Sequence, residues 1–142
     1  MKILLVAASV WGCLQALGTA HAQSHCPAAS DIRAEQLIGR WDVELQTRPP
    51  TRWTLELQAH PEHEGSLRGT LTHATQQALV VADWDDGELT MEESHDGQRI
   101  AATWLGSASP GQCGQQIEGL RQSGDAISSA PLRFTMRSRH VR

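Results

Sequence analysis

The stretch that most constrains the fold is residues 37–45, Leu-Ile-Gly-Arg-Trp-Asp-Val-Glu-Leu. Trp41, Val43 and Leu45 fall on one face of an extended chain, and the charged residues between them fall on the other. A period of two is typical of a β-strand with one buried and one solvated face. The stretch therefore predicts a first strand that ends near residue 46 and covers a core with its apolar face.

A short helix is predicted immediately before this strand, and more strands are predicted after it. Ser30 or Asp31 can cap a helix over residues 32–37, which Gly39 can end. Downstream, turn signals such as Asp86-Gly87 separate further segments with strand character. These segments lie near residues 52–58, 67–71, 78–84, 89–91, 98–105, 113–121 and 132–136. The pattern predicts an all-β fold, an eight-stranded antiparallel up-and-down β-barrel with a short N-terminal helix.

Residues 1–22 are predicted to be a signal peptide. Lys2 supplies a positive start, an apolar run follows, and Ala20-His21-Ala22 is a small-x-small cleavage signal. Residues 23–142 then have the size of a single domain. The apolar run is too short and too interrupted to favour a membrane span. We therefore expect a periplasmic or secreted protein.

The charge of residues 23–142 argues against nucleic-acid binding. Eleven arginines and no lysine stand against sixteen acidic residues, a formal charge of about −5. The same region has no tyrosine and no asparagine, so it lacks common hydrogen-bonding groups for a polar ligand.

Two cysteines remain after processing, Cys26 and Cys113. In an exported chain, two cysteines most simply form one disulfide, and two free buried thiols are the alternative. In an up-and-down barrel, the segment before the first strand and the loop before the seventh strand lie at the same end. The barrel and the Cys26–Cys113 disulfide are therefore mutually consistent predictions.

The motif Gly39-Arg40-Trp41, after a short helix and on the first strand, resembles the calycins, the group of barrels that includes lipocalins and avidins. The resemblance implies a barrel whose tryptophan plugs one end, with an arginine late in the last strand packed over it. Arg137 is the nearest candidate for that arginine. Trp104 lies on a strand similar to one that offers a tryptophan to biotin in avidins. The polar partners of biotin have no counterpart here, so we expect no biotin binding. Small bacterial metalloprotease inhibitors share a similar Gly-x-Trp strand.

Motifs for catalysis or cofactor binding are not found, and we expect no enzymatic activity and no cofactor. His60 and His63 have a His-x-x-His spacing, but Pro61 stands where a zinc-binding helix would be required. Solvated loop histidines are the favoured interpretation. The acidic run between Asp83 and Asp96 does not have the spacing of a calcium loop and fits the polar faces of a hairpin.

The aromatic residues suggest what the barrel interior contains. An eight-stranded barrel is just wide enough to be filled by side chains or to hold one small ligand. Several large apolar residues fall on the inward parity, and the sixth strand puts Ile100, Ala102 and Trp104 together on that face. The parity of Trp84 is open, and three or four indoles alone could fill the space. The candidate ligand-contacting residues are Trp41, Trp53, Leu55, Trp84, Met91, Trp104 and Phe134.

Two functions from different classes follow. The first is an exported, non-enzymatic barrel that binds a small apolar ligand. The second is a rigid barrel that binds another protein, for example as a periplasmic protease inhibitor. An empty interior would favour the first, and a filled interior with an exposed apolar patch would favour the second.

A metal site is also predicted at the mature N-terminus. Cleavage after Ala22 would leave Gln23-Ser24-His25, with a histidine in third position. The α-amine, two deprotonated amides and the imidazole can form a square-planar set of four nitrogens, which suits Cu(II) or Ni(II). Cyclisation of Gln23 or cleavage after Ala20 would remove this set.

Overall fold

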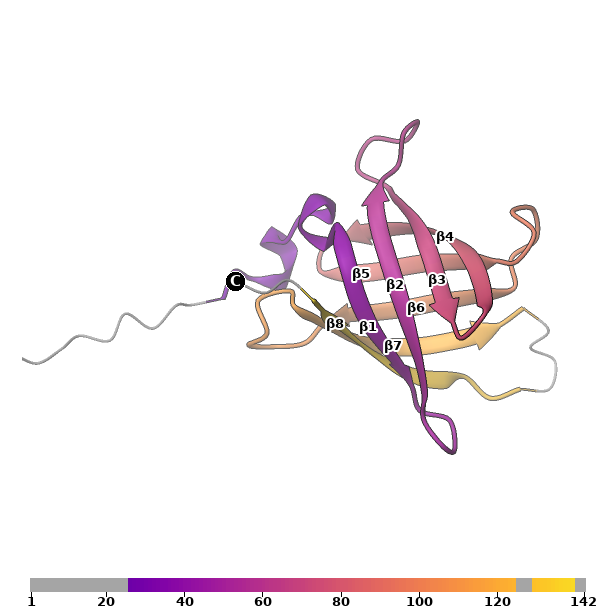
Figure 1. The fold of residues 1–142 in the computed structure, drawn as a ribbon. Helices are drawn as coiled ribbons and strands as arrows, with labels where there is room; N and C mark the ends of the chain where they lie inside the picture. Colours follow the sequence, from indigo (N-terminus) through magenta and orange to yellow (C-terminus); the bar gives the residue numbers. More distant parts are fainter. Residues whose placement is uncertain (1–25, 125–128, 140–142) are drawn as a thin grey trace, which may run out of the picture.

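The computed structural model describes residues 26–124 and 129–139, and these residues form a closed β-barrel (Figure 1). Eight strands follow one another in chain order. They are β1 (Gly39–Leu45), β2 (Thr51–Ala59), β3 (Leu67–His73), β4 (Gln76–Asp85), β5 (Glu88–Ser94), β6 (Ala102–Ala108), β7 (Gln116–Ser123) and β8 (Leu132–Ser138). The predicted signal peptide, residues 1–22, lies outside the described residues.

Each strand pairs in antiparallel fashion with the next, and β8 returns to pair with β1. In the register, Trp41 stands opposite Leu55 on β2 and opposite Ser138 on β8. Closure leaves no strand edge unpaired, which removes the edges that an open sheet would present to other chains. The predicted eight-stranded antiparallel barrel is confirmed.

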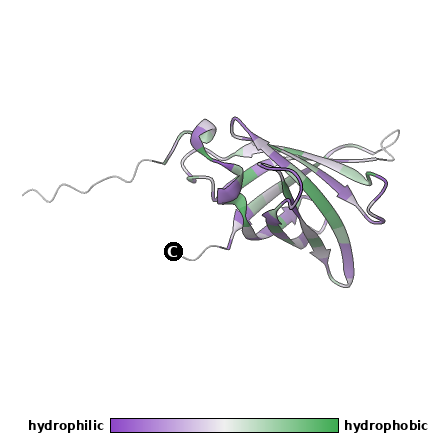
Figure 2. Ribbon diagram, turned by 90° about the horizontal axis from the view of Figure 1, so that it is seen from above, coloured by the Kyte–Doolittle hydropathy of each residue, from purple (hydrophilic) through white to green (hydrophobic). Residues whose placement is uncertain are grey.

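The strands close into a barrel because one face of each is apolar. Along β4 the buried fraction alternates strictly, with Ala78, Val80, Ala82 and Trp84 buried and the residues between them exposed. The parity of Trp84, open from the sequence, is therefore inward. Hydrophobic and hydrophilic residues both occur along the strands in Figure 2, as a period of two requires.

The predicted N-terminal helix is wrong in its type and extent. The segment instead contains two 3₁₀ turns, η1 (Ala29–Asp31) and η2 (Ala34–Leu37), separated by an extended Ile32. Neither Ser30 nor Asp31 provides a capping hydrogen bond; the Arg33 backbone N–H donates to Gln36 Oε1 instead, over 2.8 Å. Nucleation of an α-helix is unfavourable, and a segment this short forms too few hydrogen bonds to offset it. Packing against the barrel therefore sets its shape.

The sixth strand begins later than its alternation predicted. Ile100, expected to face inward with Ala102 and Trp104, lies before β6 and is 52% exposed. The turn explains the difference, because Asp96 Oδ1 accepts hydrogen bonds from the backbone N–H groups of Gln98 and Arg99. These bonds hold the residues before Ile100 in a loop rather than in the ladder.

The barrel has two distinct ends. The arm end carries η1 and η2 and is formed by the starts of β1, β3, β5 and β7 (Figure 1). The far end is formed by the ends of those strands and the starts of the even-numbered strands. In the described part of the chain, no helix combines the length and the apolar character needed to cross a membrane.

Candidate functional site

The barrel interior is filled by the side chains that the sequence predicted to contact a ligand. Trp41, Leu55, Met91, Trp104 and Phe134 each expose 2% of their surface or less. A side chain that borders a water-sized space retains measurable exposure, so Leu55, Met91 and Trp104, at 0%, border no such space. Trp84, at 9%, is also buried. The structure thus brings six of the seven predicted residues into one core and leaves only Trp53 half-buried.

A glycine on β6 makes room for an aromatic ring inside the barrel. Gly106 on β6 stands opposite Gly119 on β7, and Gly119 stands opposite Phe134 on β8. A Cβ added at Gly106 would lie 2.8 Å from Phe134 Cζ. The Phe134 ring in turn meets the Trp104 ring edge-on, with centroids 5.1 Å apart. The interior is close-packed here, and no further side-chain volume fits without movement.

The segment before β1 closes the arm end. Ile32, Ala34 and Leu37 are buried in the same core. Two indoles hold this segment in place: Trp41 Nε1 donates to the Leu37 carbonyl over 2.8 Å, and Trp84 Nε1 donates to the Ile32 carbonyl over 2.9 Å. Each buried N–H is therefore satisfied, which a buried indole requires.

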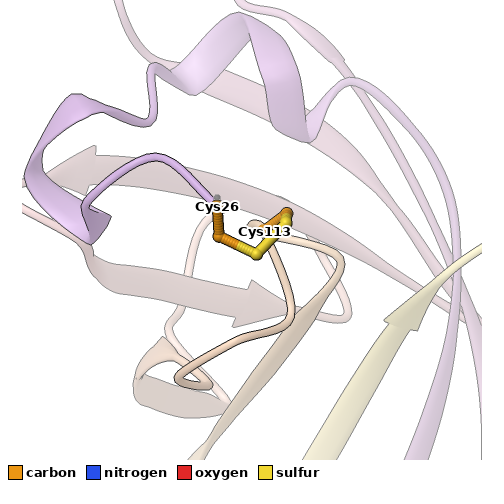
Figure 3. The surroundings of a disulfide bond; sticks show 2 residues. All are labelled: Cys26 and Cys113. Carbon is orange, nitrogen blue, oxygen red and sulfur yellow. A yellow bond between two sulfur atoms is a disulfide. The ribbon is translucent and has the colours of Figure 1, made fainter. Parts of the chain in front are cut away.

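The predicted cysteine pair also lies at the arm end (Figure 3). Cys26 precedes η1 and Cys113 lies in the loop between β6 and β7, with their Cα atoms 4.6 Å apart in disulfide geometry. Figure 3 shows the bridge joining the two segments. Cys113 has a φ of +50°, in the left-handed region, and is followed by Gly114 at +75°.

A buried ion pair crosses the interior near the far end. Glu93 on β5 is fully buried, and its carboxylate receives Arg121 of β7 through two hydrogen bonds, Nε to Oε2 at 2.9 Å and Nη2 to Oε1 at 3.1 Å. Trp104 Nε1 donates to Glu93 Oε2 over 3.0 Å. The Arg121 guanidinium lies 5.4 Å from the centroid of the Trp104 ring. His95 Nε2 lies 3.7 Å from Glu93 Oε1.

Sequence reasoning missed this pair. Glu93 was assigned to the acidic run on the polar face of a hairpin, although it continues the inward parity of Leu89 and Met91. Arg121 likewise has the parity of Ile117 on β7. The parity was available, but a charged residue is buried only when a partner on another strand compensates its charge, and the sequence alone does not show that partner.

Trp53 differs from the other predicted residues. It lies on β2 near the far end, where its ring stacks on His73 with centroids 4.8 Å apart and 25° between the planes. Its Nε1 is inaccessible to solvent and has no hydrogen-bond partner among the described residues.

Arg137 does not pack over Trp41 as the calycin resemblance implied. It faces outward, and its Nε donates to Gln116 Oε1 over 3.1 Å. Arg139 forms an exposed ion pair with Asp42, which lowers the pKa of that carboxyl. The Trp41 indole N–H donates to the Leu37 carbonyl.

His60 and His63 lie together in the loop between β2 and β3, with their ring centroids 4.5 Å apart. His60 Nδ1 lies 3.2 Å from the backbone N–H groups of Glu62 and His63 and accepts from them. Within residues 26–124 and 129–139, no group of three or more His, Cys, Asp or Glu residues is arranged to hold a metal ion. The predicted copper or nickel site, Gln23, Ser24 and His25, lies outside the described residues.

The outer wall carries the remaining candidate features. Its exposed large apolar residues are Leu79, Val81, Ile100, Leu105 and Leu120. A hollow of about 210 Å³ is lined by Leu79, Val81 and Ile100, and a second, of about 260 Å³, lies on the other side of Leu79 and Val81. Leu105 and Leu120 form a separate cross-strand pair on β6 and β7.

No protein-family model matches the chain, and no curated protein matches it. Among solved structures, a redesigned β-barrel aligns with 81% of this chain and 97% of its own, at 13% identity and a TM-score of 0.49. An eight-stranded closed barrel is compatible with the calycin resemblance.

Proposed function

We propose that this protein is an exported, non-enzymatic barrel that acts by binding another protein chain through its outer surface. The observation that carries the proposal is the filled interior, in which Trp41, Trp104 and Phe134 expose 2% of their surface or less. Of the two functions considered from the sequence, a filled barrel favours the protein-binding one.

A small ligand could enter only by displacing packed side chains. The route from the far end passes the Glu93–Arg121 pair, which Trp104 also contacts. Breaking a buried ion pair by moving one partner away costs about 3–5 kcal/mol, because the other charge stays buried without compensation. Displacing a large aromatic adds a cost of similar size. A ligand of drug-like size has little binding free energy left after such costs.

The outer wall supplies the second line of support. Leu79 and Val81 lie on the same face of β4, and Ile100 lines the adjoining hollow, so three apolar side chains of about half exposure gather in one region. An exposed apolar cluster rimmed by polar residues is typical of a protein–protein contact.

One observation favours the small-ligand alternative. Trp53 Nε1 is buried without a partner among the described residues. A ligand carbonyl could accept from it at the far end. The interior beyond Trp53 is nevertheless filled, so such a ligand would bind at the rim.

Titration with small apolar probes tests the proposal. Tryptophan emission is followed while benzene and larger aromatic probes are added. We expect no saturable shift with the unmodified protein, because no space beside Trp104 admits a probe. The matched positive control is Phe134→Ala, which should open a cavity next to Trp104 and bind benzene. A saturable shift in the unmodified protein, with an affinity comparable to that of the control, would favour the ligand-binding alternative.

Export is tested separately by sequencing the N-terminus of the protein recovered from the periplasm or the medium. The proposal requires a mature chain that begins at Gln23. Recovery of the chain only in the cytoplasm, with Met1 retained, would contradict it.

A further inference from the structure

The outer face of β4 presents an apolar ridge that the described chain leaves uncovered. Leu79 and Val81 are 55% and 44% exposed, and Val80 between them is buried in the core. The hollow that includes Ile100 flanks this ridge on the β5 side, and the hollow that includes Arg68 flanks it on the β3 side. Leu79 and Val81 are therefore open to contact from another chain.

Opposite charges stand on the two sides of Val81. Its Cα partner on β3 is Arg68, and its Cα partner on β5 is Glu92. Leu79 stands between the uncharged Thr70 and Ser94 in the same two pairings. The outer surface therefore carries a row of cation, apolar residue and anion across three adjacent strands.

Arg68 and Glu92 have no partner of opposite charge within the described part of the chain. Both are exposed, and neither forms an ion pair or a side-chain hydrogen bond with a described residue. By contrast, several other exposed arginines pair with an acid of the same chain: Arg40 with Glu56, Arg52 with Glu44, Arg99 with Asp96 and Arg139 with Asp42.

We propose that the β4 ridge, defined as Arg68, Leu79, Val81, Glu92 and Ile100, binds a second copy of this chain. A two-fold axis parallel to β4 and lying in the contact plane places Val81 against Val81 and Leu79 against Leu79. The same rotation exchanges the two sides of the ridge. Arg68 of each copy then faces Glu92 of the other, which gives two equivalent ion pairs around an apolar centre.

The charge pattern selects both the occupant and the orientation. An isologous contact requires a surface that is its own complement, and a cation–apolar–anion row meets this condition. A two-fold axis across the strands would instead place Arg68 against Arg68 and Glu92 against Glu92, which is repulsive. The pattern therefore favours a second copy with its β4 parallel to that of the first.

The proposal rests on the proposed function, because it names the partner chain of the outer surface. The wall of a barrel is convex, so we expect the area buried in this contact to be small for a protein–protein interface. Such contacts are typically weak and reversible. Exposed ion pairs are screened by salt, and the association should therefore weaken as ionic strength rises.

The experiment is sedimentation equilibrium of the purified, disulfide-bonded protein over about 5–500 µM, the range in which contacts of this kind associate. The unmodified protein should show a monomer–dimer equilibrium. Arg68→Glu should weaken it by at least about tenfold, because each new carboxylate faces Glu92 of the other copy. Glu92→Arg should weaken it equally for the converse reason. An equimolar mixture of the two variants should form a heterodimer, since both contacts then pair opposite charges.

Matched controls carry the same changes of charge elsewhere on the wall. Arg133→Glu on β8 and Glu88→Arg on β5 should leave the association constant within about twofold of the unmodified value, because they lie outside the β4 ridge. Thermal unfolding checks that every variant is folded.

A monomer at all concentrations would overturn the proposal, as would single variants that associate normally or a mixture that stays monomeric. A monomeric protein that also binds no apolar probe would leave the proposed function in place with a different partner. Saturable probe binding would instead contradict the proposed function itself.

Discussion

At the scale of residues, Glu93 and Arg121 show what side-chain parity predicts and where it stops. The inward parity of Trp41, Trp104 and Phe134 could be read from the alternation of their strands, and their burial confirms it. The same alternation places Glu93 inward, but a carboxylate in an acidic run is usually solvated, and its compensation depends on an arginine 28 residues away. Whether Glu93 on β5 meets Arg121 on β7 depends on how both strands align with β6 between them, and the sequence does not show this alignment.

The Glu93–Arg121 pair leads to a prediction about stability. Arg121→Met should lower the free energy of unfolding by about 3–5 kcal/mol, because the buried Glu93 carboxyl group then loses its cationic partner. The double variant Glu93→Leu with Arg121→Met should recover most of this loss, since no buried charge remains. Urea unfolding of both single variants and the double variant measures the coupling. Additive losses would mean that the two side chains do not form the pair described.

Asp96 leads to a prediction about pH. Hydrogen bonds from the backbone N–H groups of Arg99 and Gln98 lower its pKa to about 2. A carboxyl with a lowered folded-state pKa stabilises the protein above its unfolded pKa, and this contribution is lost as the pH falls toward 2. Asp96→Asn should therefore destabilise the protein near neutral pH and flatten the dependence of stability on pH between about 4 and 2. Thermal melts at several pH values test this, and an unchanged acid limb would contradict it.

At the scale of elements, strands were predictable and the segment before them was not. A strand of seven residues, such as Gly39–Leu45, is long enough to show the alternation of apolar and polar residues. The turns η1 and η2 have only three and four residues, too few to show a period. The alternation of Ile100 with Ala102 also predicts a strand position for Ile100. The hydrogen bonds of the Asp96 turn keep Ile100 out of the ladder, and β6 begins only at Ala102. Local hydrogen bonds of a turn override periodicity at strand ends.

The predicted disulfide belongs to this scale because it joins the N-terminal segment to the loop before β7. Cys26 and Cys113 are 87 residues apart, and closing a loop of this length stabilises by roughly 4 kcal/mol on the chain-entropy model. Cys26→Ser should lower the free energy of unfolding by a few kcal/mol, measured by urea unfolding. The same loss should follow Cys113→Ser.

Mass spectrometry checks the bond itself. The freshly prepared protein should be two hydrogens lighter than its reduced form. Two thiols that react with an alkylating reagent in the folded protein would show that the bridge is absent.

At the scale of the whole molecule, closure of the barrel followed from the number and order of the strands. The state of its interior did not, because filling depends on whether particular side chains, such as Phe134 over Gly106, occupy the space that the strands enclose. The outer ridge was equally inaccessible to prediction, since the sequence does not show that Arg68 and Glu92 flank Val81 from two different strands. Together these features support a filled barrel that makes its contacts with other chains through its outer wall.

A crystal structure of the protein under xenon pressure tests the filled interior most directly, because xenon binds apolar cavities that stay dry. The account predicts no xenon atom among Trp41, Met91, Trp104 and Phe134, whereas crystals of Phe134→Ala should hold one beside Trp104. A well-occupied xenon site inside the unmodified barrel would show an internal cavity and contradict the account.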